Sequence, residues 1–552
     1  MVDNGVTNLR ILARAEDCSG AGDWAEAARL WEQVVTSNPV NGNFWARLAA
    51  AHFESKDYAA AAAAYEKAWE LGVQRQETFD ETPSEIAYRI ACCHAGLGDR
   101  DQAVDALERA LDAGFRELDR ARADECWEFV RTEQRIRDLL GIVETSGLSR
   151  VEGWRIDLRF MAREVKRLAY APFGEISEAD FDRRVAELVD QIPVLSDAQL
   201  IVGMMKLVRY CGDGHAFVRP AKEDQLLLRA LPLDFYDFAE GTFIIAAAPE
   251  YRRLIGAQLE KVGAHDLADV QAALDPVISR DNDLRVRFVV PRWLVWTPML
   301  HALGLIDEPD QAVLTLRLRD GSHEVVTVRA VPSEPNPTKP YPANWTALPD
   351  DLPEPLPLYL RDRELPYWFD YLPGDDLVYF QFNAVQNHPA ESFAAFCDRL
   401  FGFIADRRPS RLVIDLRWNG GGNTALVSSL LHHLISCPTV NRRGALFVII
   451  GRQTFSAAQN TATYLERETA AVFVGEPTGS RPNFIGETIP FELPVSRVVV
   501  NVADLYWQTS WPSDHRTWIA PQIYAPPTFE AFSRNQDPAM DAISGQMVQP
   551  TG

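Results

Sequence analysis

The sequence has few features that would cross-link the chain or carry it through a membrane. Its seven cysteines are scattered over 552 residues and never form a Cys-x-x-Cys pair, which argues against a disulfide scaffold or a zinc knot. We expect buried thiols in a reducing compartment. No apolar run approaches the roughly 18 residues that cross a bilayer. The N-terminus also lacks the basic and then apolar pattern of a secretory signal, so a cytoplasmic location is expected.

Positive charge is also scarce. The chain carries 55 lysines and arginines against 78 acidic residues, a formal net charge of −23 at pH 7. This balance repels phosphate backbones and anionic lipid surfaces, so neither nucleic acid nor a membrane is expected as a partner. The adjacent His432 and His433 have no partners at metal-ligand spacing. No metal and no cofactor are therefore predicted.

The composition is otherwise that of a folded protein with several domains. Hydrophobic residues make up 47% of the chain and charged residues 24%, as in ordinary globular proteins. A length of 552 residues exceeds what one hydrophobic core usually organises. Two to four domains are the natural expectation.

Helical hairpin repeats are indicated for residues 1–145. Three segments align with one another: residues 22–31, 56–65 and 98–107. The first two lie 34 positions apart, and a polar insertion near residues 74–81 delays the third. A period of this length, with a small residue where helices cross and a larger apolar one four positions later, is typical of tetratricopeptide repeats. Such stacks bind peptides or partner proteins. An irregular helical bundle is the alternative.

The middle of the chain changes character twice. Residues 146–225 are predicted to be amphipathic helices that lead into Asp213-Gly214-His215. Residues 226–330 show short alternating strands and a helical stretch near residues 293–303, which favours a β-rich module. This module is either PDZ-like or of another β-rich type. Residues 331–358 are dense in proline, which fixes φ and removes a backbone donor, so we expect an extended connector.

Residues 359–530 alternate between short apolar strands and helices. Strands are predicted at residues 377–380, 412–414, 445–450 and 472–474, with helices at residues 390–405, 424–435 and 457–467. Nearly all-apolar strands separated by helices indicate an α/β sheet covered on both faces. Residues 531–552 are expected to be a C-terminal tail.

Three motifs lie where this alternation turns. Residues 415–422 read Asp-Leu-Arg-Trp-Asn-Gly-Gly-Gly, and the glycines let backbone N–H groups converge on an anion. Ser456 stands at the first turn of the next helix, where free N–H groups and the helix dipole favour a developing oxyanion. Residues 475–483 form a turn after the following strand. A phosphate loop at residues 420–422 is a poorer interpretation, because no lysine follows the glycines.

Together with Asp213-Gly214-His215, these motifs resemble the serine peptidase family that includes tail-specific (C-terminal processing) proteases, the tricorn core and interphotoreceptor retinoid-binding protein. The resemblance spans roughly residues 151–526. It implies a crotonase-like β/α spiral for the core, Ser456 as nucleophile, and a peptide or protein substrate. The expected fold class is therefore multidomain: an all-α repeat array followed by an α/β peptidase core with a β-rich module.

The absence of a downstream lysine limits which residue can act as the base for Ser456. Some members of the family pair the serine with a downstream lysine, but no lysine follows Lys339. Arg481 lies near the expected place, yet a guanidinium stays protonated and cannot accept a proton. The tricorn-like branch takes a histidine from a DGH motif, which His215 matches, and a neutral imidazole suits this task. His515, in a polar turn, is the weaker candidate.

The resemblance also implies the remaining catalytic groups. A carboxylate should orient the imidazole of His215; Asp514 is the first candidate and Glu487 the second. The backbone N–H groups of Gly421 and Ala457 would form the oxyanion hole.

Two classes of function remain open. The first is a serine peptidase or other acyl-transferring hydrolase, with Arg481 and Asn483 as candidates to line its substrate cleft. The second is a catalytically silent scaffold on the same fold that binds a ligand or partner. The helical repeats suit partner recruitment in either case.

Overall fold

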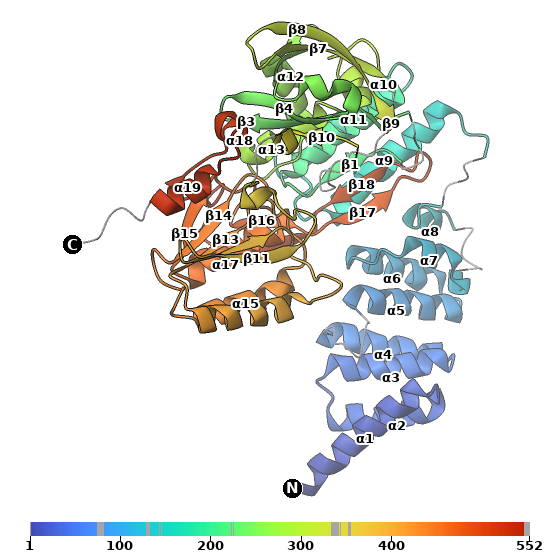
Figure 1. The fold of residues 1–552 in the computed structure, drawn as a ribbon. Helices are drawn as coiled ribbons and strands as arrows, with labels where there is room; N and C mark the ends of the chain where they lie inside the picture. The colour runs from blue at the N-terminus through green and yellow to red at the C-terminus, as the bar shows by residue number, and fades with distance from the viewer. Residues whose placement is uncertain are drawn as a thin grey trace. The chain divides into compact units, whose positions relative to one another are not determined.

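The structure is a computed structural model that describes residues 2–73, 82–127, 133–142, 144, 146–221, 224, 226–332, 342, 344–351 and 355–545. Backbone contacts divide the chain into two units, Met1–Ile156 and Asp157–Gly552 (Figure 1). The polar insertion at residues 74–81 and part of the proline-rich connector lie outside the described residues. No helix of the described part is long and apolar enough to cross a membrane.

The first unit consists of short helices joined as hairpins. They are α1 (Val2–Gly20), α2 (Trp24–Ser37), α3 (Gly42–Glu54), α4 (Tyr58–Leu71), α5 (Pro83–Leu97), α6 (Arg100–Asp112), α7 (Leu118–Ala123), η1 (Glu125–Trp127) and α8 (Gln134–Leu139). The predicted crossing residues Ala27, Ala61 and Ala103 are fully buried. An aspartate caps α2, α4 and α6 in turn, each accepting from an N–H three residues later. The repeat interpretation of the first unit is therefore confirmed.

Helix α9 (Arg150–Leu168) runs from the first unit into the second. It is followed by α10 (Glu178–Gln191), α11 (Asp197–Val208), η2 (Arg209–Cys211) and β1 (Phe217–Arg219). β1 pairs with β18 (Val499–Val502), which pairs in turn with β17 (Ile489–Glu492). The buried carboxylate of Asp157 accepts hydrogen bonds from the N–H groups of Val495 and Ser496, at 2.9 and 2.7 Å. Helix α9 thereby holds the hairpin on which the strand after His215 is built.

The β-rich module contains most of the strands between residues 226 and 347. They are β2 (Arg229–Ala230), β3 (Leu233–Phe238), β4 (Gly241–Ala247), β5 (Gln258–Val262), β6 (His265–Asp266), β7 (Gln311–Arg317), β8 (His323–Arg329), β9 (Val331–Pro332) and β10 (Thr346–Ala347). The main sheet has the order β10-β4-β5-β7-β8, with β3 on β4 and β6 on β5. A β-rich module is confirmed, and its PDZ-like character stays a prediction.

Helices line one side of this module. They are η3 (Pro249–Leu254), α12 (Leu267–Leu274), η4 (Asp275–Val277), α13 (Asp283–Trp293) and α14 (Thr297–Ala302). The helical stretch expected near residues 293–303 contains α14, and a separate helix, α13, capped by the Asn282 side chain, precedes it. A pocket of about 840 Å³ lies between the β3–β4 turn, α12 and α13.

The core of the second unit is a six-stranded sheet of order β11-β12-β13-β14-β15-β20. Its strands are β11 (Tyr367–Leu372), β12 (Leu377–Phe382), β13 (Arg411–Asp415), β14 (Leu446–Ile450), β15 (Val472–Gly475) and β20 (Ile523–Tyr524). All neighbours are parallel except β11 and β12. The predicted α/β alternation is confirmed, and the carboxyl ends of β13, β14 and β15 bring the three motifs to one edge.

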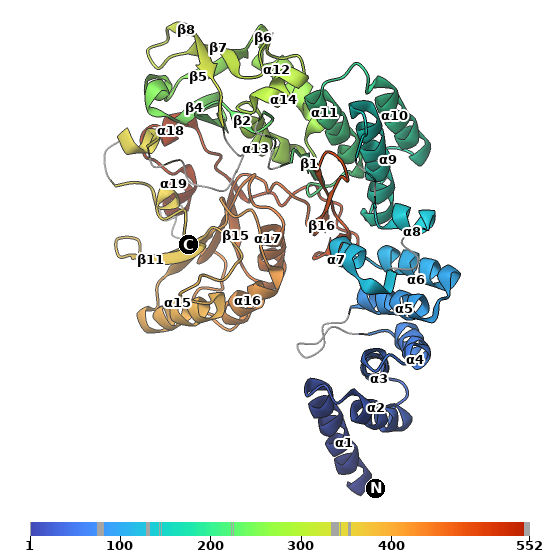
Figure 2. The same ribbon diagram turned by 90° about the vertical axis from the view of Figure 1, so that its right-hand side faces the viewer.

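Both faces of this sheet are covered, as Figures 1 and 2 show. One face packs on α15 (Phe393–Arg407), α16 (Val427–Ile435) and α17 (Ala457–Glu468). The other face packs on α19 (Pro538–Gly545) through Ala539 and Ile543. Residues 531–552 were expected to be a tail, but their described part holds this packed helix. The remaining elements are η5 (Leu348–Asp351), η6 (Leu358–Leu360), η7 (Thr424–Leu426), β16 (Asn483–Gly486), β19 (Leu505–Gln508) and α18 (Phe529–Phe532).

Replacing Asp157 by alanine should lower the free energy of unfolding of the second unit by about 2 kcal/mol, because two backbone donors lose a buried acceptor. Urea unfolding followed by tryptophan fluorescence measures the change. Asp190→Ala, which removes an exposed carboxylate from α10, is the matched control and should be nearly neutral. Equal effects of the two substitutions would contradict the role given to Asp157.

Candidate active site

Ser456 occupies a strained turn between β14 and α17. Its backbone has φ 55° and ψ −127°, a region that residues other than glycine rarely adopt and that costs about 1–3 kcal/mol. A serine at this position commonly caps its helix, but the Ser456 side chain makes no capping hydrogen bond. A sharp strand-to-helix turn of this kind presents a hydroxyl away from the backbone, as nucleophile elbows do.

The glycine loop lies directly against this turn. Gly421 has φ 117°, and a Cβ placed on it would lie only 2.7 Å from the Cβ of Ser456. The loop is fixed from below, since Asn419 Nδ2 donates to the Phe382 carbonyl at 2.9 Å. Val385 binds the loop edge, donating its N–H to the Gly421 carbonyl at 2.9 Å. The close approach requires glycine at position 421.

The two expected oxyanion donors differ in whether their N–H groups already make hydrogen bonds. The Gly421 N–H donates to Asn419 Oδ1 at 3.0 Å. The Ala457 N–H, at the start of α17, has no acceptor among the described residues. Ala457 is therefore the more available donor in this arrangement, whereas an oxyanion would have to share the Gly421 N–H with Asn419.

His215 lies beside the residue that precedes Ser456. Its ring stacks on Phe455, with centroids 4.5 Å apart and an interplanar angle of 26°, and on Phe484 at 5.6 Å and 6°. Neither ring nitrogen makes a hydrogen bond of good geometry to a described residue, although the Ile485 backbone lies close enough to oppose the lowering of the ring's pKa. Burial, together with the positive charge of Arg285, lowers the pKa of His215 to about 3. The imidazole is thus neutral at pH 7 but makes no hydrogen bond to Ser456.

The turn that carries His215 is held by two buried carboxylates. Asp213 accepts from the N–H groups of His215 and Ala216, at 2.8 and 2.7 Å, and so shapes the turn. Asp281 accepts from the Gly214 N–H at 2.9 Å. Burial, with the nearby charge of Asp281, raises the pKa of Asp213 to about 7.

Sequence reasoning missed Asp281. Besides the Gly214 N–H, its carboxylate binds the Ser480 hydroxyl, so it connects the histidine turn to the turn after β15. The next residue, Asn282, adds hydrogen bonds from its amide to the carbonyls of Thr478 and Thr517, at 3.1 and 2.7 Å. No local pattern distinguishes Asp281 from the other acidic residues of the chain.

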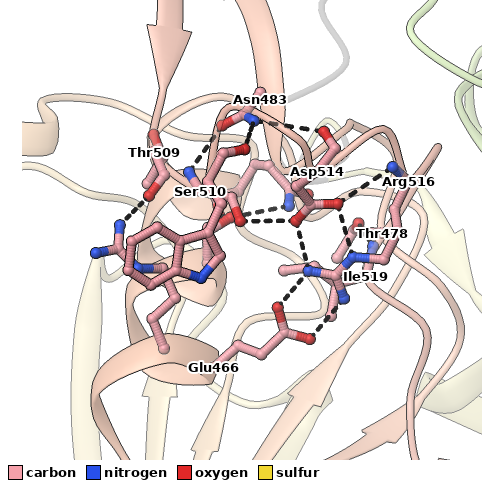
Figure 3. Close-up of polar contacts among 12 residues, drawn as sticks. Glu466, Thr478, Asn483, Thr509, Ser510, Asp514, Arg516 and Ile519 are labelled. Carbon is pink, nitrogen blue, oxygen red and sulfur yellow. Dashed lines mark hydrogen bonds and ion pairs between the residues drawn. The ribbon is translucent and has the colours of Figure 1, made fainter.

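The Asp514 carboxylate is bound by groups other than His215. Figure 3 shows its carboxylate bound by Arg516, through Nε at 2.9 Å and Nη2 at 2.8 Å, and by the Ser510 hydroxyl at 2.7 Å. Arg516 holds the pKa of Asp514 well below its usual range. Glu487 is exposed in the turn between β16 and β17. Neither expected carboxylate makes a hydrogen bond to His215 in this structure.

The two residues expected to line the cleft have structural contacts. Asn483 is buried; its amide donates to the Trp511 carbonyl at 2.8 Å and accepts from the Ser510 N–H at 2.7 Å (Figure 3). It fixes the loop that carries Asp514. Arg481 is exposed, with Nε donating to the Asp281 carbonyl at 2.8 Å. Its guanidinium remains available to a ligand from the solvent side.

Comparison with known proteins gives different matches for the helical repeats and for the larger part of the chain. Residues 84–113 match the tetratricopeptide repeat family. No curated protein matches the sequence. Mature CPAF superposes with a TM-score of 0.50 and 14% identity, covering 71% of this chain and 96% of CPAF. A mutant of CPAF gives 0.51 and 12%, covering 73% and 98%. The chain shares the CPAF fold.

Two weaker likenesses carry the names that the motifs suggested. The photosystem II D1 C-terminal processing protease has a TM-score of 0.34 and 13% identity, covering 71% of this chain and 96% of that one. The tricorn protease also has a TM-score of 0.34, with 12% identity, covering 71% of this chain and 36% of that one.

Substituting Gly421 by alanine should abolish any chemistry at Ser456, because the new Cβ would displace the serine or the loop. We expect a loss of at least about 100-fold in the rate of covalent labelling of Ser456 by a fluorophosphonate, on the scale of losing an oxyanion donor. Gly420→Ala is the matched control, since a Cβ there meets no atom within 4 Å. Equal rates for both variants would show that the close approach is irrelevant.

Proposed function

We propose that the second unit is a serine hydrolase that cleaves peptide bonds, with Ser456 as nucleophile. The supporting observation is the strained backbone of Ser456, whose side chain leaves the helix uncapped and lies against a glycine loop. Strain of this kind persists only where the surrounding structure enforces it, and it concentrates at functional sites. The CPAF-like fold and the motif order support the same reaction class, and peptides are the proposed substrates.

In this proposal His215 acts as the general base. Its neutral imidazole takes the proton of the Ser456 hydroxyl as that oxygen attacks the carbonyl carbon, and returns it to the leaving amine. The His215 ring stacks on Phe455, the residue that precedes Ser456. The proposed proton transfer therefore requires the ring to rotate until one of its nitrogens meets the Ser456 hydroxyl. Contacts of this type are often loose before substrate binds.

The acidic partner and the oxyanion donors are assigned on the same basis. Asp514 is proposed to steady the imidazolium once the ring has turned, with Glu487 as the second candidate. The N–H of Ala457 is proposed as the first oxyanion donor and that of Gly421 as the second. Arg481, exposed beside Asp281, is proposed to contact the substrate.

A fluorophosphonate probe tests the nucleophile directly. The purified protein should be labelled on Ser456, and Ser456→Ala should lose the label along with at least about 1,000-fold of any peptidase activity. Tryptic mass spectrometry locates the modified residue. Ser428→Ala, which changes an exposed serine of α16, should stay labelled on Ser456. Labelling that survives in Ser456→Ala would refute the assignment.

The pH dependence tests the state of His215. Because its pKa is lowered to about 3, the imidazole stays neutral well below the ordinary value of 6.5. The labelling rate should therefore remain flat from pH 7 to pH 5, whereas with an ordinary histidine it would fall about 25-fold. A decline centred near pH 6.5 would mean that the ring leaves its aromatic site before it acts.

A catalytically silent scaffold is the second candidate, favoured by one observation. Within the residues that the structure describes, His215 makes no side-chain hydrogen bond, and neither Asp514 nor Glu487 binds it. On this hypothesis the intact protein would label with no serine probe and cleave no peptide library, while still binding a partner through the repeats. Absence of labelling, with the fold verified by circular dichroism, would decide for it.

A further inference from the structure

The C-terminal segment from Thr528 to Gly545 reaches the glycine loop through one aspartate. Asp537 is buried and binds both terminal nitrogens of Arg417, with two contacts of 2.8 Å. Asp537 is itself held in place at the start of α19, because its Oδ1 also accepts from the Ala539 N–H at 3.1 Å. The C-terminal helix and the arginine thus constrain each other.

Arg417 has a second carboxylate on its other side. Asp415 accepts from Arg417 Nε at 2.8 Å and from the Arg417 N–H at 2.9 Å. The guanidinium also lies over the Tyr359 ring, 4.3 Å from its centroid. Arg417 stands only two residues before Asn419, which binds the Gly421 N–H. A displaced Arg417 would therefore shift the loop on which Ser456 rests.

The other end of the segment binds the β-rich module. Glu240, in the β3–β4 turn, accepts from the N–H groups of Phe529 and Glu530, at 2.9 and 3.2 Å. Phe529 stacks on Phe243, with centroids 3.9 Å apart and an interplanar angle of 5°. Phe532 packs on Phe238 at 5.2 Å. The segment therefore bridges the module and the catalytic sheet within the second unit.

Strand β3, which leads into the same turn, contacts the loop between β14 and Ser456. The carbonyl of Asp237 accepts from Arg452 Nη1 at 2.6 Å, and its carboxylate binds Arg287 Nε at 2.8 Å. Arg452 is buried and pairs with Glu476 through contacts of 3.0 and 2.5 Å. It lies four residues before Ser456, in the loop that follows β14. Both ends of the C-terminal segment are thus connected to a catalytic loop.

We propose that Asp537 is a positioning residue for the glycine loop, and that the segment from Thr528 to Gly545 is a clasp that sets the geometry of the active site from outside it. Asp537 touches neither Ser456 nor a substrate; it acts through Arg417. The proposal deepens the proposed hydrolase function, on which its kinetic readout rests. Its structural readout does not depend on activity.

Hydrogen–deuterium exchange on the full-length chain tests the positioning directly. Asp537→Asn keeps the size of the side chain but removes the charge that pairs with Arg417. Exchange in peptides covering residues 416–423 should accelerate at least about threefold. Asp541→Asn, on the exposed side of α19, is the matched control and should leave exchange unchanged. Loop exchange that is identical in the two variants would overturn the proposal.

Kinetics of the same variants separate positioning from general damage. Asp537→Asn should lower kcat for a peptide about tenfold with little change in KM, because the substrate still binds but the oxyanion loop is misplaced. Asp537→Glu, which restores the charge, should recover part of the loss. A change in KM alone would place the residue in binding and overturn its role here. If the wild-type chain does not react with serine probes, the hydrolase proposal fails and the exchange result alone decides on the clasp.

Discussion

The backbone of Ser456 is the constraint on which the catalytic half depends. A non-glycine residue at φ 55° reverts to a relaxed conformation unless its neighbours forbid it. Thr454 supplies part of that restraint, donating its hydroxyl to the Leu416 carbonyl at 2.9 Å and accepting from the Gly451 N–H at 3.1 Å. Its carbonyl accepts from the Gly479 N–H at 3.1 Å. One threonine thus ties the serine turn to the loops after β13 and β15.

Buried ion pairs hold the loops around Ser456 in place. Arg417 with Asp415 and Asp537, and Arg452 with Glu476, are ion pairs whose members are almost fully enclosed. Such pairs add little net stability, because desolvation offsets most of the attraction, but a displaced partner leaves an uncompensated charge. They therefore act mainly to hold one geometry. Both arginines lie in loops that precede the serine or the oxyanion donors, which is where small displacements matter most.

The imidazole of His215 is held in a different manner, by aromatic contact and not by hydrogen bonds. Phe455 and Phe484 enclose it in an apolar setting that keeps it neutral, while its ring nitrogens make no hydrogen bond of good geometry within the described part of the chain. An unpaired polar group in such a setting is costly, so a hydroxyl brought within reach would be a favoured partner.

Much of the fold followed from the sequence because its patterns are local. The apolar runs that became β12 to β15 and the helices between them were located within a few residues, and the repeats of the first unit were recognised by period. Ser456, His215 and the glycine loop were selected in the same way, by motifs of a few residues. The chain's lack of lysine after Lys339 removed one mechanism on composition alone.

Tertiary structure decided what local pattern could not carry. Asp281 and Asp537 support the site across 67 and 120 positions of sequence, and neither differs from the other acidic residues in its neighbourhood. The positive φ of Ser456, the hydrogen bond of the Gly421 N–H and the pairing of Asp514 with Arg516 could likewise not be predicted from the sequence. The sequence alone determined which elements form and which chemical groups are present. Only folding determined which of those groups meet, because each such contact is selected by the packing of several distant segments at once.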